Sequence, residues 1–172
     1  MSTDRIEKIL THSLYRECLE KLTQTEESRL YCKHNLTHFL DTARIAYIYC
    51  LENNLPLNRE IIYAAALLHD IGRAYDNARH DAVSVELAAQ ILPECGFEPE
   101  DISLITTAIA AHRDKNASSA LGKILYTADK KSRSCFACTA KDTCNWPTDK
   151  KIKLFGGNYA EKYANRPGKF HL

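Results

Sequence analysis

Residues Tyr63–Arg73 have the sequence YAAALLHDIGR, in which a mostly apolar run ends in an adjacent histidine and aspartate. The apolar run predicts a core helix, and the imidazole and carboxylate at its end need water or a partner. Neighbouring side chains on a helix point about 100° apart, so His69 and Asp70 share one cavity only near the helix end or across two metal ions. One explanation is that both are ligands of metal ions that compensate their charge.

Apolar residues recur at steps of three and four along most of the chain, and alternating strand-like stretches are missing. We therefore predict an all-α fold, a single-domain helical bundle, with helices at 3–23, 28–53, 58–72, 80–95, 99–112 and 118–134. The helical signal fades after residue 134. Residues 1–134 are expected to form the domain, with its core at 28–134, and residues 135–172 a Cys-rich segment and tail packed on it.

Composition narrows the class of protein. The chain has 172 residues, of which 45% are hydrophobic, which is enough for one domain with its own core. The net charge is +1, so no global field favours a nucleic-acid polymer or a membrane surface. The apolar runs are far shorter than the roughly 20 residues that span a bilayer, and the polar start MSTDRIEK lacks a signal-peptide pattern. We expect a cytoplasmic protein.

Histidines form the main chemical signal. Five of the seven lie at the ends or on one face of predicted helices: His34, His38, His69, His80 and His112. With Asp70 and Asp129, they supply the nitrogen and oxygen donors that suit a first-row divalent metal ion. Any one of these histidines alone is more often a helix cap or a surface residue, so the prediction depends on the joint pattern.

Three segments carry a family resemblance: HFLDTARIAY, AAALLHDIGR and LYTADKKSR. In this order they resemble the HD superfamily of metal-dependent phosphohydrolases, and the match spans residues 38–133. The resemblance implies an HD-type helical bundle in which His38 is the first ligand, His69 and Asp70 are the pair, and Asp129 is the last ligand. His80 and His112 match two further histidines of members that bind two metal ions, so the resemblance implies a dinuclear centre.

Two histidines that are four residues apart, His34 and His38, are the candidates for the first ligand. In the HD superfamily, a small or β-branched residue and an alanine follow the first histidine at the fourth and fifth positions. His38 is followed by Thr42 and Ala43 at these positions, so we assign it. His34 is then left as a neighbour of the ligands, a ligand of another group, or part of a pocket wall.

The resemblance also implies an activity. Two divalent ions bridged by Asp70 would activate water against a phosphorus atom, and the substrate would be a small soluble phosphate ester or anhydride, such as a nucleotide. Asp70 and Lys130 are the expected catalytic residues, and Arg73, Arg113 and Lys130 are expected to bind phosphate. Basic residues after a helix also commonly face solvent. The donors do not distinguish Fe, Mn, Mg, Ni and Zn, although iron is favoured.

Two other functions remain open from the sequence. Some HD-fold proteins with the same six ligands hold two irons and oxidise a small molecule with dioxygen. A non-catalytic metal-sensing or redox-sensing module is the third hypothesis. The Gly-Tyr-Pro signature of the cyclic-di-GMP phosphodiesterase branch is absent, which argues against that activity.

A second group of donors lies in the segment SCFACTAKDTCNW. Its cysteines, Cys135, Cys138 and Cys144, have the spacing C-x2-C-x5-C, which suits a zinc ion or an iron-sulfur cluster if a fourth ligand is added. Cys32 is the predicted fourth ligand, with His34 as a substitute. The alternative is a loop of ordinary reduced thiols.

Overall fold

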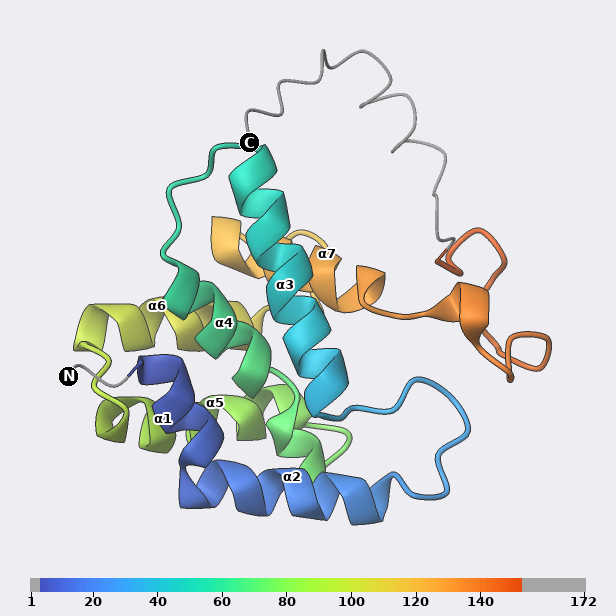
Figure 1. Ribbon diagram of the computed structural model, residues 1–172, viewed down its shortest axis with the longest axis horizontal. Helices are drawn as coiled ribbons and strands as arrows, with labels where there is room; N and C mark the ends of the chain where they lie inside the picture. Colours follow the sequence, from blue (N-terminus) through green and yellow to red (C-terminus); the bar gives the residue numbers. More distant parts are fainter. Residues whose placement is uncertain (1–3, 153–172) are drawn as a thin grey trace, which may run out of the picture. The chain divides into compact units, whose positions relative to one another are not determined.

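The computed structural model describes residues 4–152, and this part of the chain is helical without strands (Figure 1). The all-α prediction is therefore confirmed. The α-helices are α1 (Arg5–Thr11), α2 (Ser13–Thr25), α3 (Leu36–Glu52), α4 (Arg59–Leu68), α5 (His80–Glu94), α6 (Pro99–Ala110) and α7 (Ala120–Lys131). Two short 3-10 helices, η1 (Ile71–Ala74) and η2 (Cys135–Ala137), complete the set.

The described residues divide into two compact units, 4–132 and 133–152. The first unit holds all seven α-helices. In the second, η2 is followed by turns, and the Arg133 guanidinium lies 5.1 Å from the centroid of the Trp146 ring. The packing of residues 135–172 on the helical domain stays a prediction, and residues 153–172 lie outside the described part.

Helix α4 is the centre of the helical domain. Its side chains Ile61, Ile62 and Ala64 to Leu68 are buried, so the helix is covered all round. Three consecutive alanines leave little bulk on its surface, and α3, α6, α1, α7 and α5 all contact it. Because α4 ends at Leu68, His69 and Asp70 come directly after the end of the helix, and both are buried in the core.

Glycine fixes the segment that follows. A Cβ atom on Gly72 would lie 2.3 Å from the carbonyl oxygen of His80 and 2.6 Å from the amide nitrogen of Ser84. The Gly72 N–H also donates to Ser84 Oγ at 2.9 Å. The backbone of η1 therefore lies directly against the start of α5, and this close approach brings His80 next to Asp70.

Several predicted helix boundaries were wrong, for local reasons. The helix expected at 3–23 is broken at His12, whose extended backbone ends α1 and whose Nδ1 caps α2 by accepting from the Leu14 N–H. The helix expected at 28–53 begins at Leu36, because Asn35 caps it by accepting from the His38 N–H. The helix expected at 58–72 ends at Leu68, and η1 follows it.

Candidate metal centre

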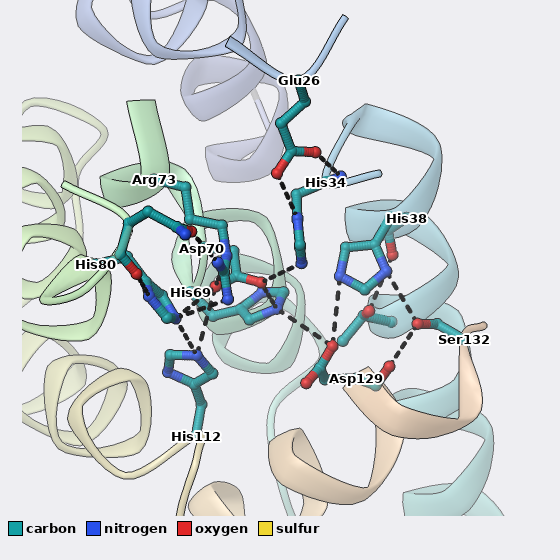
Figure 2. Close-up of polar contacts among 12 residues, drawn as sticks. Glu26, His34, His38, His69, Asp70, Arg73, His80, His112, Asp129 and Ser132 are labelled. Atoms are coloured by element: carbon teal, nitrogen blue, oxygen red, sulfur yellow. Dashed lines mark hydrogen bonds and ion pairs between the residues drawn. The ribbon is translucent and has the colours of Figure 1, made fainter. Parts of the chain in front are cut away.

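Five elements bring the six predicted ligands to one buried place (Figure 2). His38 lies in the first turn of α3, His69 and Asp70 directly follow α4, and His80 begins α5. His112 follows the end of α6, and Asp129 lies in the last turn of α7. Asp70, with an exposed fraction of 1%, lies at the centre of the group.

The first set of donors consists of His38, His69, Asp70 and Asp129, whose ligand atoms all lie within 4.8 Å of one another. His38 Nε2 is 3.4 Å from Asp129 Oδ1, and His69 Nε2 is 3.3 Å from Asp70 Oδ2. Both of these imidazole nitrogens are buried without a hydrogen-bond partner. Buried polar atoms are normally paired, so two unpaired nitrogens beside two carboxylates fit a cation-binding site.

The second set consists of Asp70, His80 and His112, again within 4.8 Å of one another. Asp70 Oδ1 is 3.0 Å from His80 Nε2 and 3.4 Å from His112 Nε2. The two oxygens of Asp70 therefore face different sets: Oδ2 faces His69 and Oδ1 faces the other two imidazoles. This is the arrangement that a carboxylate needs to bridge two ions.

The opposite nitrogen of each imidazole is held by the backbone or by a hydroxyl group. Three of the Nδ1 atoms donate to carbonyl oxygens three residues earlier, in the pairs His69 with Ala66 (2.8 Å), His80 with Asn77 (2.9 Å) and His112 with Ile109 (2.7 Å). His38 Nδ1 is 3.0 Å from Ser132 Oγ, which itself donates to the carbonyl oxygen of Asp129. A carbonyl oxygen only accepts, so the Nδ1 atoms carry the protons and Nε2 carries the lone pair in a neutral ring.

Burial and neighbouring charges together set the pKa values in the cluster. Burial lowers the pKa of His38 to about 3, with a further contribution from the nearby imidazole of His69. Burial also disfavours a charge on His69, but attraction to Asp70 and contacts with Asp129 outweigh it and raise the pKa of His69 to about 10. Burial alone would raise the pKa of Asp70, yet the surrounding imidazoles, His69 first, hold it well below its usual value. Asp70 is therefore an ionised carboxylate in the core.

A fifth imidazole lies beside the cluster. His34 is buried, and its Nε2 is 3.5 Å from Asp70 Oδ2. Its Nδ1 is 2.7 Å from Glu26 Oε1, while the His34 N–H donates to Glu26 Oε2 at 2.5 Å. Burial lowers the pKa of His34, and the hydrogen bond with Glu26 opposes this effect. Among the three placements left open for His34, the structure therefore has it next to a ligand.

Glu26 was missed by sequence reasoning. Glu26 directly follows α2 and lies in the loop before α3, whereas the sequence predicts a helix from residue 28. No spacing rule links it with His34, because a loop rather than a regular helix sets their contact. The sequence indicated only that His34, four residues before His38, could lie near the ligands.

The predicted phosphate-binding residues differ in their surroundings. Lys130 Nζ is 2.5 Å from Asp129 Oδ2, and its side chain is 32% exposed. Arg73 Nε donates to Asp70 Oδ1 at 2.9 Å, and its Nη2 is 3.1 Å from His80 Nε2. Arg113 is exposed, with Nη1 3.5 Å from the carbonyl oxygen of Ala78. Lys130 and Arg73 therefore touch the cluster, whereas Arg113 lies exposed on the surface.

The predicted cysteine ligands are partly exposed thiols. Cys32 lies in the loop before α3 with a φ of 44°, and Cys135, Cys138 and Cys144 belong to the second unit. Within residues 4–152, both clusters of three or more potential ligands are made of histidine and aspartate. A metal ion or iron-sulfur cluster on the cysteines stays a prediction.

The buried imidazole and carboxylate donors in a helical bundle define a class of metal-binding all-α domains. The HD domain family model matches residues 35–134, which is more than half of the chain, so the protein belongs to the HD domain family. The family belongs to a superfamily of metal-dependent phosphohydrolases, and the predicted resemblance is confirmed.

Proteins from two bacterial genera are similar in sequence to this chain. An uncharacterized protein of Clostridium beijerinckii is 42% identical over 151 residues, which cover 86% of this chain and 96% of that protein. Ribonuclease Y of Lactobacillus gasseri and that of Lactobacillus johnsonii are each 30% identical over 106 residues, which cover 60% of this chain but only 18% of ribonuclease Y. No solved structure matched the chain. Within the described residues, no helix has the length and apolar character to span a membrane.

Proposed function

We propose that this protein is a metal-dependent phosphohydrolase that uses a dinuclear centre to cleave a phosphate ester or anhydride of a small soluble substrate, such as a nucleotide. The observation that carries the proposal is the placement of Asp70, whose two oxygens face two separate sets of imidazole nitrogens. His38, His69 and Asp129 would hold one ion, and His80 and His112 the other. When bound, divalent ions lower the pKa of a water molecule and neutralise charge on phosphoryl oxygens.

Basic residues at the edge of the cluster would orient the phosphate. Lys130 lies beside Asp129 and is about one third exposed, so its ammonium group can contact both the centre and a substrate outside it. Arg73 is held by Asp70 and His80, so contact with a phosphate requires it to leave them. Arg113 is proposed to contact the more distant part of the substrate.

His34 and Glu26 would take up the proton that the attacking water releases. Glu26 holds Nδ1 of His34, so Nε2 faces Asp70 with its lone pair. From this position, His34 can accept the proton that the attacking water releases, and the Glu26 carboxylate stabilises the imidazolium that forms. The proton can then pass to the oxygen of the leaving group.

The net charge of the chain favours a small substrate over a nucleic-acid polymer. Ribonuclease Y is by name a ribonuclease, but this chain covers only 18% of it. A protein that binds a nucleic-acid polymer usually carries a basic surface, whereas this chain has a net charge of +1. We therefore propose a small phosphorylated molecule.

Parallel measurement of phosphate release and oxygen uptake tests this proposal. Anaerobically purified protein is loaded separately with Mn²⁺, Fe²⁺, Ni²⁺, Zn²⁺ or Mg²⁺ and assayed against a panel of nucleotides and dinucleotides. We expect phosphate release without oxygen uptake, and its loss by at least about 100-fold in Asp70→Asn. Oxygen consumption by an iron-loaded form without phosphate release would instead establish the oxygenase alternative.

A further inference from the structure

The guanidinium of Arg73 lies within the second set of donors (Figure 2). Its Nε donates to Asp70 Oδ1 at 2.9 Å, and its Nη2 is 3.1 Å from His80 Nε2. The third nitrogen, Nη1, donates to Asn77 Oδ1 at 2.5 Å. Arg73 thus contacts two of the three residues of that set, and Asn77 holds the guanidinium in place.

The contacts of Arg73 use the atoms that an ion would need. Asp70 Oδ1 is the oxygen that faces His80 and His112. Because His80 Nδ1 donates to the carbonyl oxygen of Asn77, His80 Nε2 has its lone pair available either to Arg73 or to an ion, but not to both. The Arg73 contacts and an ion in this set therefore exclude each other.

Lys130 provides a contrast at the first set. Its Nζ contacts Asp129 Oδ2, whereas Asp129 Oδ1 faces His38 and His69. The lysine thus uses the carboxylate oxygen that points away from these imidazoles. An ion in the first set can bind without displacing Lys130.

Charge reinforces this difference. The first set contains two carboxylates, Asp70 and Asp129, whereas the second contains Asp70 alone. A divalent ion next to the Arg73 guanidinium would place three positive charges around a single carboxylate in a buried site. Like charges at such distances repel strongly in the protein interior.

We propose that Arg73 is a built-in cation that occupies the second half of the centre and makes its metal binding sequential. The first set fills with a tightly held ion, and the second set binds an ion only after Arg73 has left Asp70 and His80. Arg73 therefore sets the number of ions bound at a given metal concentration. This inference rests on the dinuclear centre of the proposed function.

Titration of metal-free, full-length protein with Mn²⁺ tests the inference, with isothermal calorimetry for affinity and electron paramagnetic resonance for coupled ion pairs. For the wild type, we expect one tight and one weak site. In Arg73→Ala the weak site should tighten by at least about tenfold, because no charge-assisted hydrogen bonds must break before the ion enters. The coupled signal should then appear at lower Mn²⁺ concentration.

Two further variants make the test specific. Asn77→Ala removes the side chain that holds Nη1 and should shift the weak site in the same direction by a smaller factor. Arg79→Ala is the matched control: it removes a positive charge from an exposed side chain paired with Asp76 and should leave both affinities unchanged. Circular dichroism checks that each variant is folded.

The outcomes separate the inference from the proposed function. Two equally tight sites in the wild type, or a weak site that Arg73→Ala and Asn77→Ala leave unchanged, would overturn the role of Arg73 while the dinuclear centre stands. Failure of the wild type and of all three variants to bind Mn²⁺ would overturn the centre itself.

Discussion

His38 Nε2 lies 3.4 Å from Asp129 Oδ1, although one residue lies in the first turn of α3 and the other in the last turn of α7. Neither atom lies on the surface, because the His38 side chain is 9% exposed and that of Asp129 2%. The contact closes the cluster around the end of α4 and places donors from both ends of the HD segment in one buried group.

Conservative changes of the two aspartates should have different effects on metal content. Asp129→Asn removes a charge from the first set alone, so we expect loss of the tight ion. Asp70→Asn removes the carboxylate that both sets share, so both ions should be lost. Elemental analysis of dialysed protein measures this directly, and equal stoichiometry in both variants would argue against a bridging Asp70.

Ser132 should tune the affinity of the first ion. Its hydroxyl group holds Nδ1 of His38 and donates to the carbonyl oxygen of Asp129. Without it, the His38 ring loses its orientation, so Ser132→Ala should weaken binding of the tight ion by about tenfold or more. Calorimetry provides the affinity, and Ser134→Ala, two residues along the chain, serves as a control expected to match the wild type.

Glu26 should act on turnover through His34. Glu26→Gln keeps the shape of the side chain but removes the charge that stabilises a protonated His34. We expect kcat to fall by about 10- to 100-fold with little change in KM or metal content. A pH profile of kcat distinguishes this role from a purely structural one, because only loss of a proton-transfer partner should change its shape. An unaltered kcat would rule out the proton role.

Gly72→Ala should destabilise the domain. The new Cβ would meet backbone atoms of His80 and Ser84 at 2.3 and 2.6 Å, so η1 and α5 must move apart. Overpacking of this kind typically lowers the free energy of unfolding by about 1–3 kcal/mol. Urea unfolding measures the loss, and metal content reports whether His80 still reaches Asp70. Wild-type stability would show that the segment yields without strain.

The cysteines of the second unit lead to a separate prediction. If Cys135, Cys138 and Cys144 bind zinc or an iron-sulfur cluster, Cys138→Ser should release that metal while the His and Asp centre keeps its own ions. Zinc, iron and sulfide analysis of anaerobically purified protein checks this. Identical metal content in wild type and variant would identify the cysteines as ordinary thiols.

The sequence by itself determined the helical class and named the histidines and aspartates that the fold brings together. Apolar periodicity is local, so the buried character of Tyr63–Arg73 and the position of His69 and Asp70 at its end were readable without coordinates. The family pattern then ordered the other four donors along the chain. The ends of the helices were harder to predict. Apolar residues before Asn35 suggest a helix from residue 28, whereas the cap at Asn35 starts α3 at Leu36.

Only the tertiary structure decided which atoms meet. The contact of Glu26 with His34 forms through a loop, and loop geometry has no periodicity from which it could be predicted. The contact of Arg73 Nη2 with His80 Nε2 depends on how closely Gly72 lets η1 approach α5. Sequence determines which groups are available, whereas packing of distant segments determines which imidazole faces which oxygen of Asp70, because such contacts depend on distances that only the folded chain sets.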